Sequence, residues 1–270
     1  MTAADLHLHS SASDGEFSPR QVVQMAKAHG LDLVALTDHD TLAGVGEALV
    51  AGEEHSVTVI PGIELSTKLA GEEVHILGYY VRPGGTELDA MLANIQNARV
   101  ERIQTIVKRL QELGFALSWP EVLAAAEGSS SIGRPHVAKV MVEKGYATSI
   151  KEVFSRWIGA GCPAYVPRYK LSPTQAINLI HLAGGLAFLA HPGLLHADMA
   201  VAENLVHHGL DGLEVFHSEH SPLQIRKYLA WAQAKGLYVT GGSDWHGHSG
   251  DLRLGQVRVP IDLVKPWIKD

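Results

Sequence analysis

The chain has 270 residues, of which 46% are hydrophobic and 19% charged, and this predicts a soluble globular protein with one large α/β domain or a core with a modest insertion. Its formal net charge of −7 argues against a broad surface for nucleic acid, although a local cationic site stays open. The single cysteine, Cys162, excludes an internal disulfide framework and a cluster of thiolate metal ligands.

The first predicted strand contains the pattern DLHLHS at residues 5–10. Side chains two apart in a strand point to the same face, so His7 and His9 would present two imidazoles to one ion. The His-x-His pattern alone also fits a half-buried strand with two incidental polar residues. A short polar loop with Asp14 follows, and then a helix over residues 18–30 that begins with a serine cap and a proline.

The second strand is an apolar run over residues 33–36, typical of a strand in a parallel sheet that is buried on both faces. It leads to His39, and a helix over residues 42–54 follows. The unit is therefore strand, helix, strand, with a histidine after the second strand.

The next two strands are expected to pair directly with each other. One covers residues 57–66 and contains Glu64, and the other covers residues 72–80 and contains His75. The connection is too short for a crossover helix. We therefore expect a hairpin around residues 69–71.

From residue 84 the apolar spacing becomes helical. Apolar residues from Leu88 to Leu113 predict a long helix ending at a glycine. Shorter helices are expected over residues 120–126, 135–144 and 150–158. We therefore divide the chain into a βα core of residues 1–83 and 171–270 and a mostly helical insertion of residues 84–170.

Alternating helices and strands return after the insertion. Strands are expected over residues 186–190, 213–217 and 237–240, each preceded by a helix. His191 follows the first of these strands, His217 ends the second, and Asp244 and His246 follow the third. The carboxyl ends of barrel strands gather on one face, which carries the chemistry of such folds.

Nine side chains on or beside these strands are candidate metal ligands. They comprise six imidazoles and three carboxylates, a donor set that suits Zn²⁺, Mn²⁺ or Fe²⁺. They are too many for one ion but enough for two or three if a carboxylate bridges, and three divalent ions would leave about +3 to attract phosphate. The candidates are His7, His9, Asp14, His39, Glu64, His75, His191, Asp244 and His246.

Five short motifs, in order, resemble those of the PHP (polymerase and histidinol phosphatase) family of metal-dependent phosphoesterases. They are DLHLHS at 5–10, LTDHD at 36–40, PGIE at 61–64, HPG at 191–193 and SDWH at 243–246. The resemblance implies a distorted (β/α)7 barrel over residues 1–83 and 171–270. It also implies a centre of three divalent ions, for which we rank Mn²⁺ first and Zn²⁺, Fe²⁺ or Co²⁺ as alternatives.

The resemblance further implies a grouping of the nine ligands around Glu64, which would bridge two ions. One ion would be held by His7, His9 and Asp244, and the second by His75 and His191. The third would be held by Asp14, His39 and His246.

The implied reaction is hydrolysis of a phosphomonoester by a hydroxide that bridges metal ions. Asp14 and His217 are the candidate catalytic residues, and His217 would be either a general acid or a phosphate contact. Asp38 and Asp40 flank His39 and would either orient an imidazole or cap the next helix.

Substrate choice is expected to depend on the insertion. Arg99 and Arg102 share a helix face, whereas Arg134 and His136 begin another helix. Arginine binds phosphate through two hydrogen bonds, and a helix N-terminus adds backbone donors. The alternative is that these arginines are solvated or pair with glutamates on their own helix.

The short architecture with its helical insertion is similar to nucleoside 3′,5′-bisphosphate phosphatases, which are related to 5′→3′ exoribonucleases that act on short RNAs. We therefore predict release of phosphate from a bisphosphate such as pAp, and from 5′-phosphorylated short RNAs. The alternatives are a histidinol-phosphate phosphatase and a catalytically silent metal- or phosphate-binding regulatory module. The acidic net charge disfavours a nuclease that acts on long nucleic acid.

The expected partner is thus a small phosphorylated substrate, without an extended nucleic-acid surface. The start of the chain has no signal-peptide pattern, and no segment has the roughly 18 apolar residues of a membrane span. We therefore expect a cytoplasmic protein that does not contact a membrane. The sequence leaves the oligomeric state open.

Overall fold

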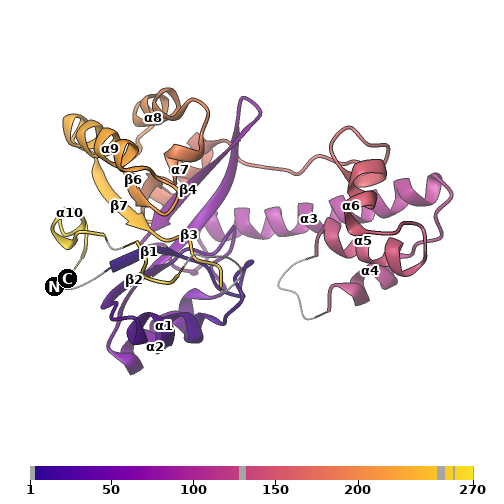
Figure 1. Ribbon diagram of the computed structural model, residues 1–270, viewed down its shortest axis with the longest axis horizontal. Helices are drawn as coiled ribbons and strands as arrows, with labels where there is room; N and C mark the ends of the chain where they lie inside the picture. Colours follow the sequence, from indigo (N-terminus) through magenta and orange to yellow (C-terminus); the bar gives the residue numbers. More distant parts are fainter. Residues whose placement is uncertain (1–3, 128–131, 248–252, 258, 270) are drawn as a thin grey trace. The chain divides into compact units, whose positions relative to one another are not determined.

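The computed structural model describes residues 4–127, 132–247, 253–257 and 259–269. The chain divides into two compact units (Figure 1). The first comprises Met1–Ala90 and Leu171–Asp270, and the second comprises Met91–Lys170.

The first unit is built on a mixed sheet of seven strands that lie in sequence order. The first three strands are parallel to one another, and so are the last three. The fourth strand lies between these two groups and is antiparallel to both of its neighbours. The strands are β1 (Ala4–Leu8), β2 (Leu33–Leu36), β3 (Thr58–Leu69), β4 (Glu72–Tyr79), β5 (Leu186–Leu189), β6 (Gly212–His217) and β7 (Tyr238–Gly242).

The two edges of this sheet come together, so that the sheet is nearly closed into a barrel. Leu8 forms a parallel bridge with Trp245, and the Asp244 N–H donates to the carbonyl of His7 at 2.9 Å. A Cβ on Gly242 would overlap the backbone nitrogen and the Cβ of His7, so glycine permits the close approach of β7 to β1. The predicted distorted (β/α)7 barrel and the predicted β3–β4 hairpin are both confirmed.

The helices of this unit begin with strong local signals. Ser18, Ser172 and Ser221 each form a capping box with a glutamine three residues later, and a proline follows each serine. The helices are α1 (Pro19–Ala28), α2 (Val45–His55), α7 (Pro173–Leu182), α8 (Asp198–Val206), α9 (Pro222–Lys235) and α10 (Ile261–Val264).

Helices α1 and α2 cover one part of the barrel wall. Leu8 of β1 and Leu36 of β2 belong to one buried cluster with Val22 of α1 and Ala48 of α2. Burial of each such aliphatic side chain contributes about 1.5–3 kcal/mol. This packing fixes β1 and β2, and with them the loops that follow these strands.

The second unit consists of helices with a hydrophobic core of their own, to which Ile106, Leu110 and Met141 contribute. The long helix expected from the sequence is confirmed as α3 (Glu87–Glu112). The shorter elements are α4 (Trp119–Ala125), α5 (Arg134–Glu143), α6 (Ile150–Val153) and the π-helix η1 (Phe154–Ile158). Among the residues that the structure describes, no helix is both long enough and apolar enough to cross a membrane.

Candidate metal centre

The nine candidate ligands come from, or directly follow, the strands of the first unit. His7 lies in β1, Glu64 in β3 and His75 in β4, whereas the other six lie in loops at the carboxyl ends of β1, β2, β5 and β7. Because β4 runs antiparallel to its neighbours, the first half of β4 reaches the same rim as their carboxyl ends. The topology therefore brings His75 to a face that is otherwise formed by strand ends.

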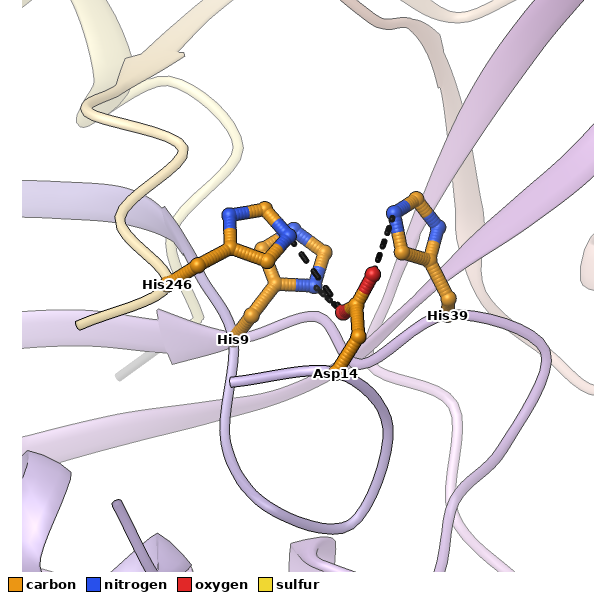
Figure 2. Close-up of side chains that lie close together, drawn as sticks. All are labelled: His9, Asp14, His39 and His246. Carbon is orange, nitrogen blue, oxygen red and sulfur yellow. Dashed lines mark ion pairs between the residues drawn. The ribbon is translucent and has the colours of Figure 1, made fainter. Parts of the chain in front are cut away.

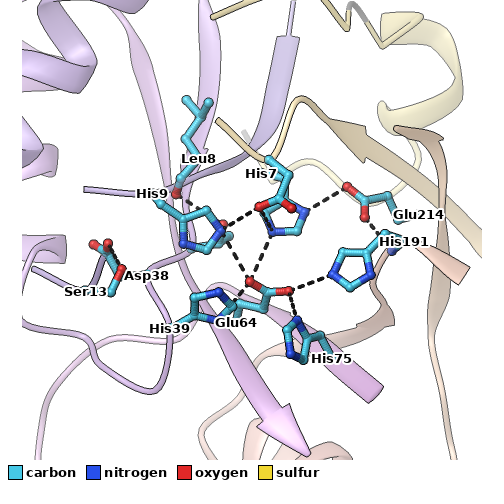
Figure 3. Close-up of polar contacts among 12 residues, drawn as sticks. His7, Leu8, His9, Ser13, Asp38, His39, Glu64, His75, His191 and Glu214 are labelled. Atoms are coloured by element: carbon cyan, nitrogen blue, oxygen red, sulfur yellow. Dashed lines mark hydrogen bonds and ion pairs between the residues drawn. The ribbon is translucent and has the colours of Figure 1, made fainter. Parts of the chain in front are cut away.

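Glu64 is the centre of the cluster (Figure 3). Its side chain is only 1% exposed. Its Oε2 lies 3.3 Å from Nε2 of both His7 and His9, and its Oε1 lies 2.8 Å from His75 Nδ1 and 3.1 Å from His191 Nε2. One buried carboxylate thus faces imidazoles at both oxygens, with His39 as a third ring beside Oε2 at 3.1 Å.

Asp244 completes the first of these groups. Its Oδ1 lies 3.0 Å from His9 Nε2 and 3.3 Å from His7 Nε2. Two imidazole nitrogens and two carboxylate oxygens therefore converge in a space of the size that one ion requires.

A further group surrounds Asp14 (Figure 2). Asp14 Oδ1 lies 3.3 Å from His246 Nε2 and 3.8 Å from His9 Nδ1, and Oδ2 lies 3.9 Å from His39 Nε2. His9 therefore presents one ring nitrogen to this group and the other to Glu64 and Asp244. His39 has a similar position, because its Nδ1 lies 3.1 Å from Glu64 Oε2.

Several polar atoms at the centre are buried without a hydrogen-bond partner. A buried polar atom without a partner costs about 1–3 kcal/mol, so a cluster of such atoms calls for an explanation. Divalent ions provide one, because each of these atoms offers a lone pair that an ion can accept. The atoms include Nε2 of His7, both ring nitrogens of His9, Nδ1 of His39, Oε2 of Glu64 and Oδ1 of Asp244.

The pKa values of the clustered side chains are shifted by burial and by the charges of their neighbours. Burial opposes ionisation of Glu64, but the surrounding imidazoles outweigh it and hold the Glu64 pKa well below its usual range. Burial also opposes protonation of His9 and His75, yet neighbouring carboxylates raise the pKa of each to about 9. Burial lowers the pKa of His39 to about 4. Without ions the cluster therefore holds protons at neutral pH, and an ion that binds there replaces them.

Two candidate ligands have strained backbone conformations. Asp244 has φ = 56°, and His191 has φ = 26°. Positive φ values are uncommon for residues other than glycine, and such strain persists where the surrounding structure enforces it, often at functional sites.

The loop that carries Asp14 is fixed by Asp38. The Asp38 carboxylate accepts hydrogen bonds from the Ser10 N–H and hydroxyl, both at 2.7 Å, and from the Ser13 hydroxyl at 2.6 Å. The hydrogen bonds of Asp38 thus serve this loop rather than an imidazole. Asp40 accepts from the Ser66 N–H at 2.9 Å, and so it fixes β3 next to Glu64.

His217 lies beside the same cluster, at the end of β6. Its Nδ1 accepts a hydrogen bond from the Glu219 N–H at 3.1 Å, which assigns the proton of the neutral ring to Nε2. That Nε2 lies 3.6 Å from Asp244 Oδ2 and has no hydrogen-bond partner. The ring therefore presents an N–H group to the centre.

The candidate substrate residues all lie in the second unit. Arg102 Nε donates to the Val166 carbonyl at 2.7 Å. Burial lowers the Arg102 pKa, and the positive charges of Arg134, Arg168 and Arg99 lower it further. The charges of Arg99, Arg134 and Arg168 therefore lie near enough to Arg102 to disfavour its protonated form.

Arg134 and His136 begin α5 as expected. The Arg134 guanidinium lies 5.1 Å from the ring centroid of Phe154 and donates to the Ile158 carbonyl at 3.2 Å. His136 Nδ1 accepts a hydrogen bond from the Gly133 N–H at 3.0 Å, so one of its roles is to cap the helix.

Glu214 also lies beside the candidate ligands, although the sequence did not predict it. Its side chain is fully buried in β6, and its Oε1 lies 3.0 Å from His7 Nδ1. One signal was present in the sequence, because Glu214 is a lone carboxylate in the apolar run LEVF at residues 213–216.

The chain is similar to characterised proteins over nearly its full length. A 3′,5′-nucleoside bisphosphate phosphatase of Chromobacterium violaceum is 32% identical over an alignment of 265 positions, which covers 93% of this chain and 93% of that protein. A 5′-3′ exoribonuclease of Haemophilus influenzae is 33% identical, with 98% of each chain covered. A phosphoribosyl 1,2-cyclic phosphate 1,2-diphosphodiesterase of Eggerthella lenta is 32% identical, with 95% of this chain and 98% of that protein covered.

The chain is also similar in fold to solved structures. A solved structure from Bifidobacterium adolescentis, provisionally described as a metal-dependent phosphoesterase, matches with a TM-score of 0.77 and 34% identity, covering 97% of this chain and 94% of that chain. The model of a family described as PHP domain matches residues 5–157. The resemblance stated from the five motifs is confirmed, and the chain belongs to the PHP domain family.

Proposed function

We propose that this protein is a metal-dependent phosphomonoesterase that releases phosphate from nucleoside 3′,5′-bisphosphates such as pAp, and from 5′-phosphorylated short RNAs. The observation that carries the proposal is the cluster around Glu64, where buried imidazole and carboxylate atoms converge without hydrogen-bond partners. The names of two full-length relatives, a bisphosphate phosphatase and an exoribonuclease, support the substrate class.

The nine candidate ligands would hold three divalent ions, for which we rank Mn²⁺ first. Glu64 would contribute one oxygen to an ion with His7, His9 and Asp244, and the other oxygen to an ion with His75 and His191. Asp14, His39 and His246 would hold the third. Such ions supply Lewis acidity and lower the pKa of water toward neutrality.

The protein's own residues would position the substrate and donate hydrogen bonds to its oxygens. Asp14 is half-exposed and borders the cluster, where it would position one ion and the reacting water. His217 would donate a hydrogen bond from its Nε2–H to the leaving oxygen or to a phosphate oxygen, because the Glu219 N–H fixes that tautomer. Arg99, Arg102 and Arg134, whose charges act on one another, would bind a phosphate of the substrate together with His136.

The proposal is tested by phosphate release from the Mn²⁺-reconstituted protein. The substrates are pAp, AMP, histidinol phosphate, a cyclic 1,2-phosphodiester of ribose and a 5′-phosphorylated short RNA, all at equal concentration. We expect the largest kcat/KM for pAp, with release from the short RNA as well. Preference for histidinol phosphate or for the cyclic diester would replace the proposed substrate. No turnover at full metal loading would instead favour the silent binding module.

The same assay tests His217 with a His217→Gln variant. The loss of kcat should be larger for pAp, whose leaving alkoxide needs a hydrogen bond to stabilise its negative charge, than for p-nitrophenyl phosphate, whose leaving group is stable as an anion. A hydrogen bond to a charged group contributes about 1.5–3 kcal/mol, so the difference should be about 10- to 100-fold. An equal loss on both substrates would assign His217 to phosphate binding.

The histidinol-phosphate alternative is not favoured by the comparisons, because the three full-length relatives carry other activities. The silent module is a weaker hypothesis on geometric grounds. All nine ligand positions hold metal-binding side chains, and these side chains converge, His191 through its contact with Glu64.

A further inference from the structure

We infer that Glu214 is a positioning residue that holds two ligands of the proposed metal centre, His7 and His191, in their metal-binding orientation. The inference rests on the proposed metal centre and adds a residue that none of the five motifs contains. Glu214 lies in the middle of β6, and its side chain is 0% exposed. A carboxylate buried to this extent must be compensated by hydrogen bonds.

Each carboxylate oxygen of Glu214 serves a different ligand. Oε1 lies 3.0 Å from His7 Nδ1, and Oε2 accepts a hydrogen bond from the His191 N–H at 2.6 Å. Figure 3 shows Glu214 on the side of His7 away from Glu64, with His191 next to it. The two ligands belong to different strand ends, so one side chain couples them.

Toward His7, Glu214 selects the tautomer. A carboxylate without a proton only accepts hydrogen bonds, so His7 donates its Nδ1–H to Glu214. When the ring is neutral, as metal binding requires, its lone pair is therefore on Nε2, which lies 3.3 Å from both Glu64 Oε2 and Asp244 Oδ1. An imidazole binds a metal only through a nitrogen without a proton, so this tautomer makes His7 a ligand.

Toward His191, Glu214 fixes the main chain rather than the ring. His191 has φ = 26° and ψ = 57°, a conformation that costs free energy for a residue with a side chain. The hydrogen bond from its N–H to Glu214 holds this peptide in place. The ring then reaches the centre, with Nε2 at 3.1 Å from Glu64 Oε1.

Glu214→Gln tests the two hydrogen bonds specifically, because glutamine has nearly the same shape as glutamate but only one acceptor oxygen. Its amide group would face either His7 Nδ1 or the His191 N–H. In the first case His7 changes tautomer and carries a proton on Nε2. In the second case two N–H groups oppose each other at the strained peptide. Both arrangements weaken metal binding without removing a ligand.

The chain offers a matched control in Asp211, immediately before β6. Asp211 Oδ2 lies 2.7 Å from His181 Nε2 and accepts from the Ala187 N–H at 2.8 Å. This carboxylate also joins a histidine ring to a backbone amide, but neither partner is a candidate ligand. Asp211→Asn therefore makes the same chemical change away from the metal centre.

The experiment is a calorimetric Mn²⁺ titration of the metal-stripped wild-type protein, Glu214→Gln and Asp211→Asn, with Tm measured for each metal-free protein. We expect Glu214→Gln to weaken Mn²⁺ binding by about 10- to 100-fold, and Asp211→Asn to bind as the wild type does. Equal affinity of Glu214→Gln and the wild type would overturn the role of Glu214 alone. No Mn²⁺ uptake by the wild type would overturn the metal centre itself.

A second measurement needs no Glu214 variant and stays decisive if Glu214→Gln fails to fold. In ¹⁵N-histidine-labelled wild-type protein loaded with Zn²⁺, His7 should show a slowly exchanging proton on Nδ1. The signal is assigned by its absence from His7→Gln. A His7 ring without a proton on Nδ1 would overturn the inference.

Discussion

A Glu64→Gln variant is expected to lose at least about a thousandfold in kcat/KM, or about 4 kcal/mol of transition-state stabilisation. Glu64 faces His7 and His9 with one oxygen and His75 and His191 with the other. The amide would have no charge to balance the proposed ions, and it would turn an NH₂ group toward the imidazoles beside one oxygen position. Metal content measured by mass spectrometry should fall with activity.

Glu72→Gln is the control for this variant. Glu72 lies on β4, and its Oε1 accepts from the His196 N–H and lies 2.8 Å from His196 Nδ1, so it is also a glutamate beside a histidine. It should keep metal content and activity. If Glu64→Gln retained full metal content and wild-type turnover, Glu64 could not be the bridging ligand.

Arg134→Gln is expected to lower kcat/KM for pAp by about 10- to 100-fold while leaving p-nitrophenyl phosphate nearly unaffected. A hydrogen bond to a charged group contributes about 1.5–3 kcal/mol, which corresponds to this range. Arg134 contributes charge to the arginine cluster around Arg102. Steady-state kinetics on the two substrates measures the difference, because a simple aryl phosphate has no second phosphate for Arg134 to bind.

Arg156→Gln is the matched control in the same unit. Arg156 is 61% exposed, pairs with Glu152 at 2.7 Å and lies 4.4 Å from the Trp157 ring centroid. Arg156 also carries a guanidinium group next to an aromatic ring. It is not one of the arginines whose charges lower the pKa of Arg102. An equal loss on both substrates in Arg134→Gln would remove Arg134 from substrate selection.

The fold and the convergence of the candidate ligands could be predicted from the sequence because they depend on local patterns. Apolar runs separated by helix signals predict a barrel, and a barrel gathers on one face the residues at the carboxyl ends of its strands. His39, His191 and His246 lie just beyond strand ends and were found in this way. His75 required the hairpin as well, since only an antiparallel strand brings its first half to that rim.

The supporting contacts could not be read in this way, because they join residues that are far apart in the sequence. Glu214 and His7 are separated by 207 positions, and in isolation Glu214 is simply a polar residue in an apolar strand. Asp38 was expected to orient an imidazole or to cap a helix. Instead its carboxylate accepts from Ser10 and Ser13, which fixes the loop that carries Asp14.

The expected cytoplasmic location stays a prediction.

The measurement that tests the central claim most directly is anomalous diffraction at the manganese edge, on crystals of the reconstituted protein grown with phosphate. We predict three peaks around Glu64. One lies among His7, His9 and Asp244, one beside His75 and His191, and one beside Asp14. The absence of peaks there, together with undiminished phosphate release by chelator-treated protein, would contradict a metal centre as the source of the activity.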